Sequence, residues 1–68
     1  SQKEDTVNIN TASKEELMTL PGIGESRADA VIACREEKGS FTSIEGIKDA
    51  AGIGDGIFIR IKDLITVN

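Results

Sequence analysis

Two Gly-Ile-Gly triplets are the residues of this sequence whose types and spacing suggest binding chemistry. They occupy positions 22–24, directly after Pro21, and positions 52–54. Glycine lacks a Cβ atom and tolerates positive φ, so a backbone can approach another molecule closely at such a turn. If a helix begins after the second glycine, its first N–H groups have no partner inside the helix and carry the positive end of the helix dipole. Each triplet therefore predicts a cradle of backbone donors whose natural ligand is a phosphate.

The composition argues against most other chemistry. The 68 residues include no His, Trp or Tyr and one Cys, which excludes zinc clusters, Ser-His-Asp and Cys-His arrangements and a disulfide framework. The Gly-x-Gly-x-x-Gly dinucleotide fingerprint needs a preceding strand, and the lysine of a phosphate-binding loop is missing as well. We therefore expect a protein that is not an enzyme and that has no cofactor and no small-molecule substrate.

The charge balance limits how a phosphate would be held. The formal net charge is -4 and the pI is about 4.6, whereas domains that bind nucleic acid usually have a basic surplus. Backbone donors at the triplets are a route to phosphate binding that does not depend on bulk charge. We expect the affinity of such binding to be low.

The first part of the chain predicts a polar arm and a short helix. Residues 1–6 are interpreted as a frayed arm or the end of a linker, and residues 7–12 as an extended segment. Ser13 and Glu16 have the spacing of a capping box, so a helix is expected to begin after Ser13 with Leu17 and Leu20 pointing inward. This helix must end close to the residue before Pro21.

A longer helix is expected to open at Gly24 and to end at Gly39, which is placed as a C-terminal cap. Within it, Cys34 is interpreted as a small core residue, and the Arg35 side chain is expected to pair with a carboxylate. Phe41, just beyond the helix, is also expected in the core rather than in a base-stacking site. The residues predicted to share one face of this helix are Ala28, Val31, Ile32 and Arg35.

The second half of the sequence repeats the first at an offset of thirty positions. Ser43 falls on Ser13, the triplet 52–54 on 22–24, and Asp55 on Glu25. This correspondence indicates an internal duplication of one helical hairpin. We expect a third helix, capped by Ser43 or by Thr42 with Glu45, and a fourth over about 55–63. The apolar positions assigned to these two helices are Ile44 and Ile47 in the third, and Phe58, Ile61 and Ile65 in the fourth.

Two stretches resemble a known family. The pattern "LxxLPGIGxxxA" over 17–28 resembles the helix-hairpin-helix DNA-binding motif. The longer stretch 7–67, with its "INTA" start, "REEKGSF" joint and "ITV" end, resembles the tandem helix-hairpin-helix domain of ComEA-type competence proteins. The resemblance implies a compact, all-α, SAM-like fold of two pseudo-symmetric helical hairpins over 7–68, with motifs at about 13–39 and 42–64. It also implies non-sequence-specific binding of double-stranded DNA, with one hairpin on each strand across the minor groove.

Carried over by position, the resemblance also implies a set of site residues. Phosphates would contact backbone amides after each triplet, while Ile23 and Ile53 would point inward and hold the turns to the core. A monovalent cation on the carbonyl groups of Met18, Leu20 and Ile23 is implied in the same way, and no other metal. Lys62 is a further candidate by its charge, which either reaches a phosphate or keeps the last helix soluble. The predicted phosphate-binding residues are Gly22, Ile23, Gly24, Ser26, Arg27, Gly52, Ile53, Gly54, Gly56, Ile57 and Lys62.

One position departs from the family pattern, because Gly56 stands where the family often has a lysine. The first hairpin, with Arg27, is therefore expected to bind more strongly than the second. The family captures transforming DNA outside the cytoplasmic membrane, which implies DNA-uptake channel proteins as partners. It also implies an extracytoplasmic location, either periplasmic or anchored to the membrane by a segment outside this sequence. The acidic composition keeps an alternative open: a protein-interaction or structural module of the same fold that has lost DNA binding.

Overall fold

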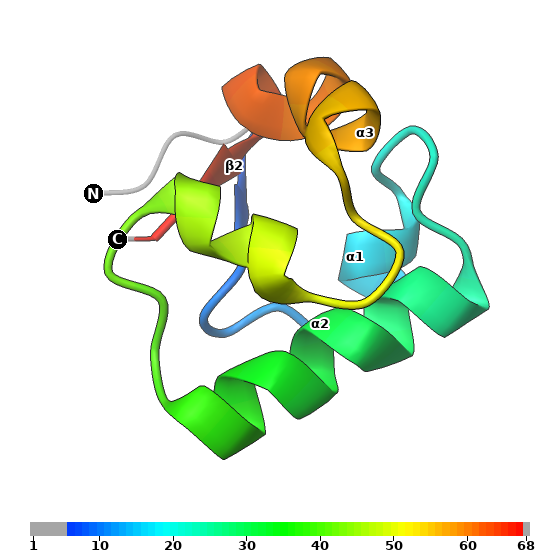
Figure 1. The fold of residues 1–68 in the computed structure, drawn as a ribbon. Helices are drawn as coiled ribbons and strands as arrows, with labels where there is room; N and C mark the ends of the chain where they lie inside the picture. The colour runs from blue at the N-terminus through cyan, green and yellow to red at the C-terminus, as the bar shows by residue number, and fades with distance from the viewer. Residues whose placement is uncertain (1–5, 68) are drawn as a thin grey trace.

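The computed structural model describes residues 6–67 of the chain. Its elements in chain order are β1 (Val7–Asn8), α1 (Lys14–Met18), α2 (Glu25–Lys38), the 3-10 helix η1 (Ile44–Asp49), α3 (Asp55–Ile61), the 3-10 helix η2 (Lys62–Leu64) and β2 (Ile65–Thr66). Figure 1 shows α2 along one side of the molecule and α3 near the opposite side, with η1 between them. The predicted fold of two helical hairpins is confirmed, and the predicted arm over 1–6 lies, apart from Thr6, outside the described residues.

The helix α1 begins with the capping box that the sequence predicts. The Ser13 Oγ atom accepts a hydrogen bond from the Glu16 amide at 3.3 Å, and the Glu16 carboxylate accepts one from the Ser13 amide at 2.9 Å. The two bonds satisfy donors that the helix start would otherwise leave free. α1 ends before Pro21, as predicted, and it packs against α2.

The hydrophobic core draws on both halves of the chain. Leu17 and Ile47, which correspond at the offset of thirty positions, are both fully buried. Burial of a side chain of this size stabilises a fold by roughly 1.5–3 kcal/mol. The inward orientation of Leu20 and the core positions of Cys34 and Phe41 are confirmed. The buried residues are Ile9, Ala12, Leu17, Leu20, Ile23, Ala28, Val31, Cys34, Phe41, Ile47, Ala50, Ile53, Ile61 and Ile65.

The third predicted helix differs from expectation in its type and its cap. η1 is a 3-10 helix, and Ser43 occupies its N-cap position without a side-chain hydrogen bond. Gly46 lies in the middle of η1, where a Cβ atom would come within 3.0 Å of the Phe41 ring. A side chain at this position would therefore crowd the ring, and the glycine found there disfavours a regular α-helix by about 1 kcal/mol relative to alanine.

The fourth predicted helix is shorter than expected. α3 ends at Ile61 and continues as the 3-10 helix η2, so Ile65 lies in β2 and not in a helical stripe. β2 pairs in parallel with β1, with Val7 opposite Ile65, and the Ile9 amide extends the pairing by donating to the Thr66 carbonyl at 2.9 Å. The extended segment predicted after residue 6 thus closes the fold against its far end.

The Arg35 side chain stabilises this closure in a way that the sequence did not predict. Its guanidinium donates to the backbone carbonyl of Ile9 at 2.9 Å, and no carboxylate of residues 6–67 pairs with it, in contrast to the expectation. A backbone carbonyl inside a fold needs a donor, and the guanidinium supplies one to Ile9 from α2.

Asn10 joins three chain segments with one amide group. Its Oδ1 atom accepts from the Phe41 amide at 2.7 Å, and its Nδ2 atom donates to the carbonyls of Phe41 and Val67 at 3.1 and 3.2 Å. The site is partly buried, so a lost partner there is not fully replaced by water.

Replacement of Asn10 by Ala is predicted to lower the free energy of unfolding by about 1–3 kcal/mol, because it leaves backbone groups of Phe41 and Val67 without partners. Urea unfolding followed by circular dichroism at 222 nm measures the change. Asn10→Asp should not restore stability, since a carboxylate has no proton to donate to the two carbonyls. Ser40→Ala, at an exposed loop position, is the control, and a loss no larger than that of the control would contradict the prediction.

Candidate nucleic-acid interface

Each Gly-Ile-Gly triplet begins inside a type II turn. The first turn spans Leu20–Ile23 and the second spans Ala50–Ile53, and in each the last amide donates to the first carbonyl, at 3.1 and 3.2 Å. The third residue of a type II turn needs positive φ, which Gly22 (83°) and Gly52 (85°) provide. Pro21 occupies the second position of the first turn, where its fixed φ is favourable. The sequence "LPG" is thus the local cause of the turn geometry.

The helix after each turn begins with free backbone donors. Gly24 and Gly54 are the N-caps of α2 and α3, with extended φ values of -96° and -100° and no side-chain cap. In both helices the amide four residues after the cap is the first to donate to it, at 2.9 Å. The amides of 25–27 and 55–57 consequently have no acceptor in the part of the chain that the structure describes.

The second glycine of each triplet, and Gly56 beyond the second triplet, leave these donors accessible. A Cβ atom added at Gly24, Gly54 or Gly56 would meet no other atom within 4 Å, so the space in front of each is open. By contrast, Ile23 and Ile53 are buried, and their side chains hold the turns to the core as predicted. Backbone faces outward and side chain faces inward at both turns, which is the arrangement that an anion cradle requires.

The two turns lie on the same side of the molecule, seen at the right of Figure 1. The Arg27 side chain connects them, because its Nε atom donates to the Gly52 carbonyl at 2.9 Å and its Nη1 atom to the Gly22 carbonyl at 3.4 Å. Ile57, the counterpart of Arg27 in the second hairpin, lies close to Gly22. Lys62, at the start of η2, is exposed.

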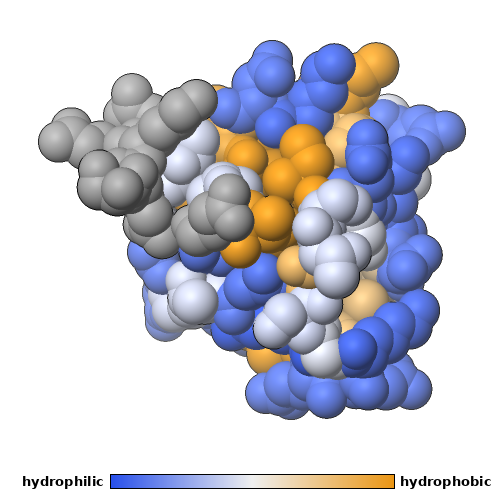
Figure 2. Space-filling view, turned by 90° about the vertical axis from the view of Figure 1, so that its left-hand side faces the viewer, coloured by the Kyte–Doolittle hydropathy of each residue, from blue (hydrophilic) through white to orange (hydrophobic). Residues whose placement is uncertain are grey.

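The opposite side of the molecule exposes hydrophobic side chains. Figure 2 shows that hydrophobic side chains gather in the middle of this face, which is the left-hand side of Figure 1. None of the helices described by the structure is both long and apolar enough to cross a bilayer. The apolar area and the two turns therefore lie on opposite sides of the molecule.

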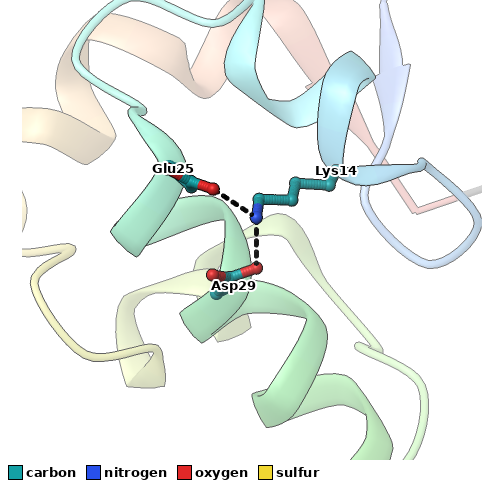
Figure 3. Close-up of polar contacts among 3 residues, drawn as sticks. All are labelled: Lys14, Glu25 and Asp29. Atoms are coloured by element: carbon teal, nitrogen blue, oxygen red, sulfur yellow. Dashed lines mark hydrogen bonds and ion pairs between the residues drawn. The ribbon is translucent and has the colours of Figure 1, made fainter.

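Lys14 partly offsets the negative charge at the start of α2. Figure 3 shows its ammonium group between two carboxylates of the first turns of α2, 2.9 Å from Glu25 and 3.2 Å from Asp29. The hydrogen bond to Glu25, followed by that to Asp29, raises the pKa of Lys14 above its ordinary value of 10.5. A raised lysine pKa means that the pair contributes to stability below pH 10.5 and that the contribution is lost as the pH rises through the folded-state pKa. The pair is thus intact throughout the neutral range.

Lys48 has the same role at the start of α3. Its ammonium group lies 3.4 Å from the Asp55 carboxylate and 4.9 Å from the centre of the Phe58 ring. A cation over an aromatic face is attracted by the electron density of the ring, so the contact holds Lys48 beside the helix start. Both carboxylates next to the free amides therefore have a lysine partner.

Sequence reasoning missed these two lysines. Each lies before its turn while its carboxylate lies after it, so no spacing within one helix connects the partners. The internal duplication does not reveal them either, because Lys14 corresponds to Ile44 and Lys48 to Met18. The two hairpins reach the same charge pairing from positions that are not equivalent.

The chain is similar in sequence to several known proteins. The chain is 54% identical over 61 residues to ComE operon protein 1 of Bacillus subtilis, an alignment that covers 90% of the chain and 30% of that protein. It is 37% identical over 65 residues to human endonuclease/exonuclease/phosphatase family domain-containing protein 1, covering 96% of the chain and 11% of that protein. An uncharacterized protein of Haemophilus influenzae is 37% identical over 62 residues, 90% of the chain and 55% of that protein. The chain thus spans less than two thirds of the length of each of these relatives.

A family model matches almost the whole chain. The model describes the helix-hairpin-helix motif, and it matches residues 2–66. The match includes both type II turns, both open helix starts and the core that supports them. On this evidence, together with the duplicated hairpin geometry, the chain belongs to the helix-hairpin-helix family.

Proposed function

We propose that this chain binds double-stranded DNA without sequence preference, through backbone amides of its two hairpins. The observation that carries the proposal is the free amides of 25–27 and 55–57, which lie on one side of a helix-hairpin-helix domain. Two like groups of donors match a ligand that presents the same anion twice, as the phosphates on the two strands beside a minor groove do. Ile23 and Ile53, which the sequence also suggested, are not free to bind, because their amides close the turns and their side chains are buried. The residues proposed to hold phosphates are therefore Gly22, Gly24, Ser26, Arg27, Gly52, Gly54, Gly56, Ile57 and Lys62.

The local charges support binding in spite of the net charge of -4. Glu25 and Asp55 are the carboxylates nearest to the free amides in sequence, and both are paired with lysines. The pairs are exposed, so each is worth little in stability. Their effect on an incoming phosphate is larger, because a paired carboxylate repels an anion less than a free one does. The positive ends of the two helix dipoles then act on the phosphate with less opposition.

The expected strength of binding follows from the kind of contact. Phosphate contacts carry no base information, so unrelated duplexes should bind alike. Non-specific complexes of this type have dissociation constants on the order of 10⁻⁴ to 10⁻⁶ M, which rise with salt concentration. A monovalent cation on the carbonyls of Met18, Leu20 and Ile23 remains part of the proposal. Carbonyl oxygens suit a hard cation, and the Leu20 oxygen, which accepts the Ile23 amide, has a second lone pair available.

The resemblance to ComEA-type competence proteins extends the proposal to DNA uptake. In DNA uptake, the domain would be the DNA-binding part of an extracytoplasmic receptor, and it would transfer bound DNA to uptake channel proteins. The identity of 54% to ComE operon protein 1 supports this context. Because the chain spans 30% of that relative, anchoring and channel contacts belong to the whole protein, and the domain is proposed as a binding module and not an enzyme.

A second candidate is a protein-interaction or structural module that keeps the fold and has lost DNA binding. The glycine at position 56 favours it, because the family often has a lysine there. The exposed side chain of Ile59 also favours it, since 67% of this large hydrophobic residue is accessible on α3. The two candidates differ in one measurable property, which is retention of duplex DNA at low salt.

Replacement of both Gly24 and Gly54 by Asp is predicted to abolish duplex binding almost completely, and either single change to weaken it. The φ values of the two residues suit any side chain, and Asp is a preferred N-cap residue, so the helices should persist or gain stability. The new carboxylate would occupy the free amides and repel a phosphate. Fluorescence polarisation with a labelled duplex at two salt concentrations measures the change.

The charge-matched control for this experiment is Ser40→Asp with Thr42→Asp. Both positions are exposed in the loop between α2 and η1, away from the turns, and the double variant adds the same charge. It should bind duplex nearly as the unmodified chain does. An equal loss of duplex affinity in the two double variants would contradict the prediction, because it would mean that binding depends only on the total charge of the protein. An unmodified chain that retains no duplex at low salt would favour the second candidate.

Replacement of Lys14 by Gln is predicted to weaken duplex binding several-fold at low salt, because it frees the carboxylates of Glu25 and Asp29 beside the first group of amides. The difference should shrink at high salt, where exposed charges are screened. Lys38→Gln is the matched control, since Lys38 also pairs with an exposed carboxylate, Asp49 at 3.6 Å, at the far end of α2. A loss of the same size in both variants would show that only the number of cations matters.

A further inference from the structure

One guanidinium group connects the equivalent carbonyls of the two turns. Gly22 and Gly52 correspond at the offset of thirty positions and have the same positive φ. The Arg27 side chain donates to both of their carbonyl oxygens, through Nε to Gly52 and through Nη1 to Gly22. Arg27 leaves the first turn of α2 and crosses to the other hairpin, so this contact couples the two halves of the domain at the surface proposed for DNA.

Side chains of each hairpin pack on the first glycine of the other hairpin's triplet. A Cβ atom at Gly52 would lie 3.4 Å from Arg27 Nε and 3.5 Å from its Cγ atom. In the first hairpin, a Cβ atom at Gly22 would lie 3.8 Å from the Ile57 side chain and 3.6 Å from Arg60 Nη1, both of the second hairpin. Each hairpin therefore covers the first glycine of the other, but of the two equivalent residues only Arg27 has a polar group to bridge the turns.

We propose that Arg27 is a positioning residue that ties the two turns together and thereby sets the separation of their phosphate donors. This inference rests on the proposed function for its effect on DNA, although the bridge itself exists without DNA. Two phosphates on opposite strands of a duplex are a fixed distance apart, so two cradles bind them together only if their own separation matches. A flexible single strand adapts to either cradle and makes no such demand.

The difference between arginine and lysine separates two possible roles of Arg27, which are to position the turns or only to supply a positive charge. A guanidinium is a rigid planar fork that donates in two directions at once, whereas the ammonium of lysine is a compact charge on a flexible stem. Arg27→Lys keeps the positive charge near the turns but does not reproduce the fork. A residue that acts only through its charge would tolerate this change, and a residue that positions the turns would not.

The first arm of the test uses the free protein. Arg27→Lys is expected to shift the carbonyl ¹³C resonances of both Gly22 and Gly52, while circular dichroism shows unchanged helix content. Arg35→Lys is the matched control, because Arg35 also donates to a backbone carbonyl, that of Ile9, away from the turns. Resonances of Gly22 and Gly52 that stay in place in Arg27→Lys would overturn the proposed bridge.

The second arm compares a duplex with a single strand of equal length. Arg27→Lys is expected to weaken duplex binding about threefold to tenfold, as for the loss of an ordinary hydrogen bond, and to leave single-strand binding unchanged. Arg35→Lys should leave both affinities unchanged. Duplex binding by Arg27→Lys at the level of the unmodified chain would overturn the positioning role. If the unmodified chain itself retains no duplex, the proposed function fails instead, and the carbonyl shifts alone decide whether the bridge exists.

Discussion

The structure depends on two residues held at positive φ, one in each type II turn. An L-residue with a side chain pays roughly 1–2 kcal/mol in this region, and glycine does not. With Gly22 and Gly52 in this conformation, each chain reversal is short enough for the preceding helix to pack on the following one. The same reversal directs the isoleucine inward and leaves the start of the next helix facing solvent. Packing and exposure of the amides are therefore two results of one backbone constraint.

The positions of the charged groups say more about phosphate binding than the net charge of the domain does. A net charge of -4 describes a molecule that should avoid polyanions. At the helix starts, however, lysines from other elements pair with the nearby carboxylates, and an arginine lies between the turns. Backbone dipoles add positive potential that no count of side chains includes. An acidic domain is thus compatible with a surface that favours phosphate locally.

Much of this fold is predictable from the sequence, because it follows from contacts between near neighbours in the chain. The capping box of Ser13, the turn at Pro21 and the buried isoleucines of the triplets depend on residues a few positions apart. The 3-10 form of η1 was not predictable, because no local pattern shows the close packing of the Phe41 ring on Gly46 that accompanies it.

The charge pairs and the bridge were not predictable for a related reason. Lys14, Lys48 and Arg27 meet their partners across turns or across the two hairpins, at distances that no local pattern encodes. The duplication was informative about the backbone and misleading about side chains, since the two halves share their turn geometry but not the residues that complete it.

The short strand pair has a mechanical consequence where the domain is continued by more chain at both ends. β1 and β2 run in parallel, so tension on the chain pulls the start of one strand and the end of the other in opposite directions. The strands would have to slide past each other, and the Ile9 amide bond, the strand ladder and the Asn10 contact to Val67 would carry the load together. This is the shearing geometry, which resists force better than bonds that open one after another. The domain is thereby strongest against tension at the two points where neighbouring chain would pull on it.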